Sequence, residues 1–330
     1  MPLENDLDVK QSRFAERVRR AVRDDARRIV IVGARGWIGR TAVALLLEAL
    51  GADTFAARVS CFGSSEGIVR VGAIDVPQRP LSDLATLDSR PTLLFHLAFL
   101  TMDKFGTMDA DDYVEGNRAL SRTVLAGLEP IGVDRLFVAS SGAAAFANDA
   151  SAADNLRCYG RLKLDDEALF AGWVEAADSR RAAIARIYSV SGPHINKHQT
   201  YALASLILAA LANQPIEVHA PMRVIRSYVA VRDLLSLVFA ALLAPEGDRV
   251  LRFDTGGEAL ELGDVAASVA RALGGTVLRR PISEPRENRY VGDASSWAAL
   301  LARFELTELP LDRQIAETAA WLARQTEPTT

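Results

Sequence analysis

Arg28-Ile29-Val30-Ile31-Val32-Gly33-Ala34-Arg35-Gly36-Trp37-Ile38-Gly39 leads directly into the apolar run 41–50 of this 330-residue chain. A β-branched run, glycines in a Gly-x-x-Gly-x-x-Gly pattern and then helical periodicity are typical of a strand that turns tightly into a helix. At such a turn, backbone N–H groups and the helix dipole can hold a pyrophosphate. The same glycines would also suit a purely structural turn. The stretch therefore predicts a dinucleotide loop or an ordinary βα turn.

The composition excludes several classes of protein. The formal net charge is −4, so no basic excess indicates nucleic acid or an anionic membrane as a partner. The two cysteines, Cys61 and Cys158, lie far apart and form neither a disulfide framework nor a metal-ligand spacing, and we expect no metal. No signal peptide is recognisable and no apolar run is long enough to span a bilayer, so we expect a cytoplasmic protein.

Apolar runs and helical patterns alternate along the first half of the chain. We expect strands at 58–62, 69–76, 92–99 and 136–142, a helix at 113–128, and a buried helix at 202–212. The polar segment 1–27 predicts a helical extension, packed loosely through Phe14, Val18 and Val22. This rhythm predicts an α/β fold with a doubly wound parallel sheet, whose ligands bind outside the carboxyl ends of the strands.

The end of the second strand bears on the choice of cofactor. A carboxylate at this place in a nicotinamide-binding fold accepts hydrogen bonds from the adenosine ribose and selects NAD. Here the strand ends in Gly63-Ser64-Ser65, without a carboxylate before Glu66. Arg35 inside the glycine loop could pair with a ribose 2′-phosphate, although a surface Arg often has no specific partner. The combination favours NADP(H), with NAD(H) as the alternative.

Tyr159 and Lys163 stand four residues apart in a helical run that opens at Cys158 and reaches Trp173. On a helix they share one face, one turn apart. Lys163 is one of only four lysines in a chain that otherwise uses Arg for positive charge. An ammonium can lower the pKa of a neighbouring phenol and also donate a hydrogen bond to a ribose hydroxyl. By contrast, we interpret His96, at the end of an apolar run, as a packed residue rather than a ligand.

Together these residues resemble the extended branch of the short-chain dehydrogenase/reductase superfamily, which contains nucleotide-sugar epimerases, dehydratases and reductases. The resemblance rests on Gly33–Gly39, His96-Leu97-Ala98, Asn117, Ser140-Ser141, Tyr159-x-x-x-Lys163, Arg186-Ile187-Tyr188-x-x-x-Gly192-Pro193 and Arg226-Ser227-Tyr228-Val229-x-Val231-x-Asp233. It implies a Rossmann-like NAD(P)-binding domain over residues 28–190. Residues 191–330 would form mainly a smaller substrate-binding lobe, with segments returning to the first domain. A homodimer through two helices of each sheet domain is also implied.

The resemblance implies a role for each matching residue. Tyr159 would be the acid/base, Lys163 would depress its pKa and hold the nicotinamide ribose, and Ser141 would orient the substrate oxygen, with Ser140 as the fallback. The cofactor-binding residues would be Gly33, Arg35, Gly36, Trp37, Ile38, Gly39, Ser64, Ser65, Asp75, Ala98 and Lys163. The substrate would contact Ser141, and a nucleotide pyrophosphate would meet Arg226, Arg286 and Arg289.

One departure from the family narrows the reaction. Sugar dehydratases of this branch carry an Asp-Glu pair after the active-site hydroxyl, whereas Ser141 is followed by Gly142-Ala143-Ala144. We therefore expect an NADP(H)-preferring oxidoreductase that reduces a nucleotide-linked keto-sugar at C4. An NAD-retaining nucleotide-sugar 4-epimerase is the main alternative. A carbonyl reductase for a substrate without a nucleotide, and a dinucleotide sensor without catalysis, are the others.

Overall fold

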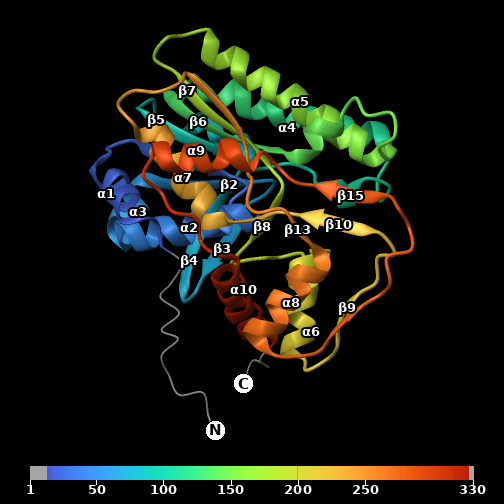
Figure 1. The fold of residues 1–330 in the computed structure, drawn as a ribbon. Coiled ribbons are helices and arrows are strands. Elements are labelled where there is room, and N and C mark those ends of the chain that lie inside the picture. The colour runs from blue at the N-terminus through green and yellow to red at the C-terminus, as the bar shows by residue number, and fades with distance from the viewer. Residues whose placement is uncertain (1–12, 199, 327–330) are drawn as a thin grey trace.

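The computed structural model describes residues 13–198 and 200–326, and a large twisted sheet forms its centre (Figure 1). The eight strands lie in the order β12-β7-β6-β5-β1-β2-β4-β3, and only β3 and β4 pair antiparallel. The chain adds strands on one side of β1 and then crosses to β5 on the other, so the order reverses between β1 and β5. The predicted Rossmann-like, doubly wound sheet is confirmed. Its strands are β1 (Arg28–Val32), β2 (Val59–Gly63), β3 (Gly67–Val71), β4 (Ile74–Pro80), β5 (Thr92–His96), β6 (Val133–Ser141), β7 (Arg181–Ile187) and β12 (Val250–Asp254).

Helices cover both faces of this sheet (Figure 1). Ile29 and Ile31 of β1 belong to one apolar core, whereas the alternate residues Val30 and Val32 belong to a second. The first core contains side chains of α1 (Glu16–Asp24), α2 (Trp37–Leu50), α3 (Ala52–Arg58) and α7 (Val231–Leu243); the second contains those of α4 (Ala110–Leu128) and α5 (Asp154–Glu175). Burial on both faces explains why β1 is apolar without alternation.

The N-terminal helix packs more tightly than we expected. Phe14, Val18 and Val22 are all buried, and the Phe14 ring meets the Phe239 ring edge-on with centroids 5.1 Å apart. The prediction of a loosely packed extension is therefore wrong for α1, because Val18 and Val22 of the helix, together with Phe14 just before it, join the core that also contains α2 and α7. Residues 1–12 of the predicted extension lie outside the described residues.

The predicted strand at 69–76 is in fact a hairpin. Gly72 adopts φ +58° and turns the chain between β3 and β4, which pair with Val69 opposite Val76. Because a left-handed residue ends a strand, the apolar pattern on either side of Gly72 belongs to two antiparallel strands. The strand that runs parallel to β2 therefore ends at Pro80, not at Val76.

The C-terminal part builds a smaller lobe beside the carboxyl edge of the sheet (Figure 1). It contains α6 (Ala202–Leu211), α8 (Leu262–Leu273), α10 (Leu311–Thr326) and the short sheets β13-β10-β15 and β14-β9. The chain returns to the large sheet through β12 and α7. The remaining elements are η1 (Leu81–Thr86), η2 (Met102–Lys104), η3 (Gly142–Phe146), β8 (Ser189–Ser191), β9 (Ile216–Val218), β10 (Arg223–Arg226), β11 (Tyr228–Ala230), β13 (Leu260–Glu261), β14 (Val277–Arg279), β15 (Glu287–Tyr290) and α9 (Ala294–Arg303).

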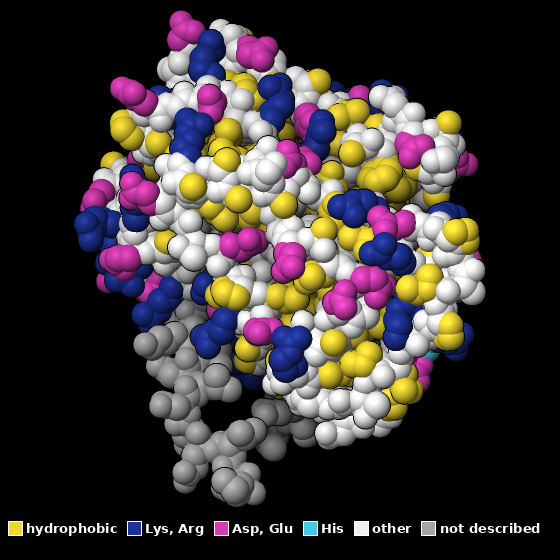
Figure 2. Space-filling model, in the orientation of Figure 1, with side chains coloured by type: hydrophobic (Ala, Val, Ile, Leu, Met, Phe, Trp, Pro, Cys, Tyr) yellow, Lys and Arg dark blue, Asp and Glu magenta, His cyan; other side chains and the backbone are white. Residues whose placement is uncertain are grey.

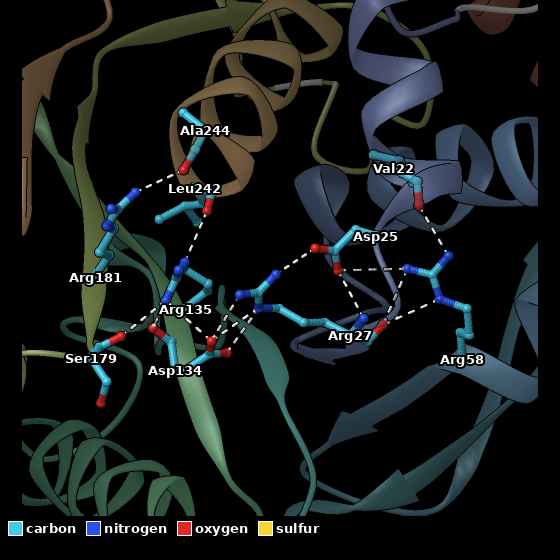
Figure 3. Close-up of polar contacts among 10 residues, drawn as sticks. All are labelled: Val22, Asp25, Arg27, Arg58, Asp134, Arg135, Ser179, Arg181, Leu242 and Ala244. Carbon is cyan, nitrogen blue, oxygen red and sulfur yellow. Dashed lines mark hydrogen bonds and ion pairs between the residues drawn. The ribbon is translucent and has the colours of Figure 1, made fainter. Parts of the chain in front are cut away.

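Arginines bridge the amino edge of the sheet to the ends of the covering helices (Figure 3). Arg58 donates to the carbonyl of Val22 in α1, and Arg135 donates to the carbonyl of Leu242 in α7. Arg181 donates to the carbonyl of Ala244, 2.7 Å away. The last carbonyls of a helix have no partner within it, so these guanidinium groups satisfy them.

The visible surface carries acidic and basic side chains interspersed with apolar ones (Figure 2). Within residues 13–198 and 200–326, no helix combines the length and apolarity needed to cross a membrane.

Candidate active site

The glycine loop joins β1 to α2 through very close backbone contacts. Gly33 adopts φ +96°, and a Cβ atom there would lie 2.7 Å from the backbone nitrogen of Ala98. A Cβ atom on Gly39 would lie 2.4 Å from the carbonyl oxygen of Gly33. The loop can therefore close only with glycine at both positions. Trp37, Ile38 and Gly39 form the first turn of α2, where backbone N–H groups have no carbonyl partner within the helix.

A cavity of about 800 Å³ opens at the carboxyl edge of the sheet, beside this loop. Its wall combines the glycine loop, the ends of β5, β6 and β7, the start of α5, and β10 and β15 of the smaller lobe. This is the place where the strand order reverses, the usual ligand site of open α/β sheets. Ten of the predicted site residues line it: Gly33, Gly36, Trp37, Ile38, Gly39, Ser141, Tyr159, Lys163, Arg226 and Arg289.

Lys163 is buried at the floor of the cavity, with 4% of its surface exposed. Its ammonium nitrogen donates to the carbonyl of Ala139, 2.9 Å away, and lies 3.5 Å from the centroid of the Phe99 ring. Burial lowers the pKa of Lys163 to about 8, against the opposing effect of two nearby carboxylates. Lys163 is therefore mostly charged at neutral pH, and two of its three protons have no partner among the bonds that the described residues make.

Tyr159 lies one helical turn before Lys163, and the Lys163 ammonium is 5.8 Å from the centroid of its ring. Burial raises the pKa of the Tyr159 phenol above its usual value, while a hydrogen bond with Ser141 opposes this shift. In this structure the phenol is thus protonated at neutral pH and can act as an acid.

The two serines at the end of β6 have different surroundings. The Ser140 hydroxyl donates to Glu167 Oε1 at 2.5 Å, and Glu167 also accepts two hydrogen bonds from Arg186 at 2.9 and 2.8 Å. The Ser141 hydroxyl accepts from the backbone N–H of Ala143 and lies 3.3 Å from the Tyr290 hydroxyl. Of the two hydroxyls, only that of Ser141 remains available to a molecule in the cavity.

Several residues that line the cavity were not found from the sequence. Tyr290 packs between Tyr188, whose ring centroid is 4.8 Å away, and Phe146, whose ring stacks at 6.0 Å. Asn288, two residues earlier in β15, accepts hydrogen bonds from Arg226 through its backbone and side-chain oxygens. The strand β15 has four residues, which are mostly exposed and polar. The two-residue spacing of Asn288 and Tyr290 was the only signal in the sequence that could have identified them.

The residues expected to bind the adenosine end lie at the edge of the cavity or beyond it. Ser64 and Ser65 are exposed in the turn after β2, and the Ser65 carbonyl accepts a hydrogen bond from the Gln78 side chain. Arg35 is also exposed and extends toward this turn: a Cβ atom on Gly67 would lie 3.3 Å from its Nη1 atom. Ala98 contributes its backbone, which packs on Gly33.

Two predicted site residues lie elsewhere. Asp75 stands near the amino end of β4, on the far part of the hairpin, where it pairs with exposed Arg70. The assignment of Asp75 to the cofactor site is therefore wrong, because the hairpin places the carboxyl end of that strand at Pro80. Arg286 precedes β15 and is exposed outside the cavity, near Glu284 and the sulfur of Met222. Its assignment to the substrate site is also corrected.

Comparisons with known proteins agree with this geometry. The sequence model of the NAD dependent epimerase/dehydratase family matches residues 29–253. MoeE5, solved with UDP-glucose and NAD, is similar over 91% of this chain and 100% of its own, with a TM-score of 0.65 and 18% identity. UDP-glucose 4-epimerase from Thermotoga maritima gives the same coverage and TM-score at 15% identity.

TunA, an NAD-dependent NDP-hexosamine 5,6-dehydratase, covers 91% of this chain and 98% of its own, with a TM-score of 0.63 and 20% identity. No curated protein matches the chain. At these identities the solved structures show the fold, whereas the family follows from the sequence match over two thirds of the chain. The resemblance stated from the motifs is confirmed, and the chain belongs to the NAD dependent epimerase/dehydratase family of enzymes.

Proposed function

We propose that this enzyme is an NADP(H)-preferring oxidoreductase that reduces a nucleotide-linked keto-sugar at C4, with Tyr159 as the acid. The observation that carries the proposal is the position of Arg35. Its guanidinium lies against Gly67, the first residue of β3, directly after the turn in which the chain has Ser64 and Ser65 instead of a carboxylate. A planar cation beside two hydroxyls suits a ribose 2′-phosphate.

The remaining residues fit a dinucleotide. The close packing of Gly33 and Gly39 leaves the start of α2 open to the cavity, so the N–H groups of its first turn can hold a pyrophosphate. Lys163 has protons free for the hydroxyls of the nicotinamide ribose. When bound, the nicotinamide supplies the hydride.

The protein's part in the reaction is to move a proton on the substrate oxygen. The protonated Tyr159 phenol donates to the carbonyl oxygen as the carbon is reduced, and Ser141 orients that oxygen by a hydrogen bond. The charged Lys163 stabilises the phenolate that remains on Tyr159, since an opposite charge favours the ionised form.

Arg226 and Arg289 suit the nucleotide diphosphate. Both line the part of the cavity built by the smaller lobe, and Arg226 is held by the carbonyl of Asn288 at 3.0 Å. A fixed guanidinium binds phosphate oxygens through two hydrogen bonds. The UDP-sugars in the solved structures of MoeE5 support the same substrate class.

Binding of NADPH and NADH to matched variants tests the cofactor assignment. Arg35→Gln should weaken NADPH binding about 10–100-fold, the value of one or two charge-assisted hydrogen bonds, and leave NADH binding unchanged. Arg70→Gln is the control, because Arg70 is paired with Asp75 on the far part of the hairpin. Equal losses for both coenzymes in Arg35→Gln would contradict the NADP(H) preference.

An NAD-retaining 4-epimerase is the second candidate, supported by contacts between segments that line the cavity. The Trp37 indole donates to the carbonyl of Pro193 at 2.7 Å, and Lys197 donates to Thr101 at 2.6 Å and Asp103 at 2.5 Å. These bonds join the loop after β8 to the glycine loop and to the loop after β5. A bound dinucleotide would leave slowly if they had to break first.

The purified enzyme distinguishes the two candidates. A reductase consumes one NADPH per turnover and should show no activity without added coenzyme. An epimerase should co-purify with a dinucleotide, detectable by mass spectrometry after denaturation, and interconvert nucleotide-sugar epimers with none added. That second result would replace the reductase assignment.

We also propose a homodimer through α4 and α5. Leu125 of α4 and Leu169 and Trp173 of α5 line a shallow hollow on the outer side of these helices. Leu169→Glu should shift the protein to monomers in analytical ultracentrifugation, because burying a carboxylate without a partner is unfavourable. A dimer that persists in this variant would contradict this interface.

A further inference from the structure

Lys163 stands above two buried carboxylates from the next turn of its own helix. Asp166 and Glu167 are only 5% and 6% exposed, and Lys163 is 4% exposed. Aspartate and glutamate are almost never buried to this extent unless a partner offsets their charge. The partner of each carboxylate therefore decides how much negative charge remains to stabilise the Lys163 ammonium.

The charge of Glu167 is already offset. Arg186 binds both of its carboxylate oxygens, at 2.9 and 2.8 Å, and Ser140 donates a third hydrogen bond at 2.5 Å. This fork-to-fork pairing is the strongest ion-pair geometry that Arg and a carboxylate form. Glu167 and Arg186 thus form a pair of zero net charge beside Lys163.

Asp166 has no comparable cation of its own. Ser121 donates to its Oδ1 at 2.6 Å, whereas Oδ2 makes no hydrogen bond and faces the Nε2 atom of His96 at 3.6 Å. That distance is too long for a hydrogen bond. His96 is buried and neither of its ring nitrogens makes a hydrogen bond, so a charged imidazolium would be unfavourable there, and burial lowers the pKa of the ring accordingly. Lys163, three residues earlier on α5 and equally buried, is then the cation left to compensate the charge of Asp166, through the buried interior and without a direct hydrogen bond.

We infer that Asp166 is the counter-charge that keeps the buried Lys163 protonated, and that it is a positioning residue for proton transfer at Tyr159. The inference rests on the proposed function for its catalytic meaning, but the charge compensation itself concerns only the protein. Asp166 acts through Lys163 and does not line the cavity.

The groups that face this pair come from each surrounding element. Besides Asp166 and Lys163, α5 contributes Glu167 and Tyr159, β5 contributes His96 and β7 contributes Arg186. With Glu167 paired and His96 neutral, loss of the Asp166 charge leaves the Lys163 ammonium buried without compensation. Such an ammonium gives up its proton at a lower pH.

Titration of the lysine side chains by NMR tests this directly, since the chain has only four lysines. With ¹³C-labelled lysine, the Lys163 signal is identified by its loss in Lys163→Met. In the parent we expect a midpoint near pH 8, in line with the lowered pKa of Lys163. Asp166→Asn should move the midpoint down by about one unit or more, the usual effect of an opposite charge nearby.

Asp165→Asn is the matched control. Asp165 neighbours Asp166 in sequence but is exposed, where it pairs with Arg118 at 3.5 Å. It should leave the Lys163 midpoint within about 0.3 unit of the parent, because solvent screens its charge. Equal midpoints in Asp166→Asn and Asp165→Asn would overturn the inference. The titration needs neither coenzyme nor substrate, so its result does not depend on the proposed function. A failure of the proposed function would instead appear as absent NADPH binding.

A folding defect in Asp166→Asn would be informative as well. The inference then expects Asp166→Asn/Lys163→Met to regain the cooperative thermal unfolding of the parent, since neither buried charge remains. A defect that persists in the double variant would overturn the pairing, because Asp166 would then support the fold without Lys163.

Discussion

The Tyr290 hydroxyl lies 3.3 Å from the Ser141 hydroxyl, although 149 residues separate them in the chain. Tyr290 belongs to β15 in the smaller lobe, where it stands opposite Arg226 in the parallel pairing with β10. The short strand pair β10–β15 therefore connects Arg226, the arginine proposed to bind the nucleotide diphosphate, with the hydroxyl of Ser141 near Tyr159. A shift of this strand pair on substrate binding would also move the Tyr290 phenol relative to Ser141.

Removal of the Tyr290 hydroxyl should change the pH dependence of the reaction. Tyr290 is one of the groups that raise the pKa of Tyr159, after burial. Tyr290→Phe should therefore lower the Tyr159 pKa and move the alkaline limb of kcat/KM for reduction, where the acid loses its proton, to lower pH. Tyr188→Phe is the control, since Tyr188 packs on Tyr290 without bonding to Ser141. An unchanged alkaline limb in Tyr290→Phe would show that the Tyr290 phenol does not influence proton transfer by Tyr159.

Substitution of Arg226, inside the cavity, and of Arg286, outside it, should have unequal effects. Arg226→Lys loses the planar fork, so KM for a nucleotide-sugar should rise about tenfold or more with kcat nearly constant. Arg286→Lys should leave both constants unchanged, because Arg286 is exposed outside the cavity. Steady-state kinetics with both variants checks this. A matching rise of KM in Arg286→Lys would return Arg286 to the substrate site.

The sequence predicted the parts of the site whose chemistry is local. The glycine loop and the Tyr159/Lys163 pair are encoded within one turn each, and the structure places both on the same cavity. Residues brought in by tertiary contacts were missed. Tyr290 reaches Ser141 from a short polar strand whose position depends on the packing of the smaller lobe.

The misplacement of Asp75 has a local cause. The run 69–76 is apolar at both ends, and only the φ +58° of Gly72 distinguishes a hairpin from one continuous strand. Similarly, the start of α5 at Asp154 lies four residues before the predicted start, because the residues 154–157 do not carry the apolar periodicity. Backbone turns of this kind depend on the pairing of neighbouring strands and helices, which periodicity does not report.

Alanine at Gly39 should disrupt the glycine loop. The new Cβ atom would lie 2.4 Å from the Gly33 carbonyl oxygen and 2.7 Å from the Ala34 Cα atom, and both are backbone atoms that cannot rotate away. We expect a loss of about 1–3 kcal/mol in the free energy of unfolding and weaker dinucleotide binding. Gly172→Ala in α5 is the matched control: apart from the adjoining backbone of its own helix, no atom lies within 4 Å of its Cβ position, so it should stabilise by up to about 1 kcal/mol. Urea unfolding of both variants measures the difference.

Loss of an arginine at the amino edge of the sheet should destabilise the fold. Arg135 donates to the carbonyls of Leu242, Ser179 and Asp134 (Figure 3). Arg135→Met keeps much of the apolar stem but leaves these carbonyls without the donor, which should cost about 2–4 kcal/mol of unfolding free energy. Arg122→Met, at an exposed pair with Glu115, should cost no more than about 0.5 kcal/mol. Equal unfolding midpoints for the two variants would show that water donates to these carbonyls as well as the guanidinium does.

Asp233 should make the enzyme less stable as the pH rises from 4 to 7. Asp233 is 6% exposed in α7, and burial raises the pKa of its carboxyl to about 6. In the unfolded chain the value is about 3.9. Between these values the folded state binds more protons than the unfolded state, so the contribution of Asp233 is present below about pH 4 and is lost as the pH rises through 6. Over the whole pH range the loss in unfolding free energy amounts to roughly 3 kcal/mol, for a difference of about two pKa units between the folded and unfolded states.

Asp233→Asn isolates this contribution from that of other titrating groups. Its amide oxygen can still accept the hydrogen bond from the backbone N–H of Leu309, which lies 2.7 Å from the carboxylate in the parent. The unfolding free energy of the variant, relative to the parent, should therefore increase by roughly 2 kcal/mol between pH 4 and pH 7, since part of the change falls below pH 4. A difference that stayed constant over this range would show that the Asp233 carboxyl titrates in the folded state as it does in the unfolded chain.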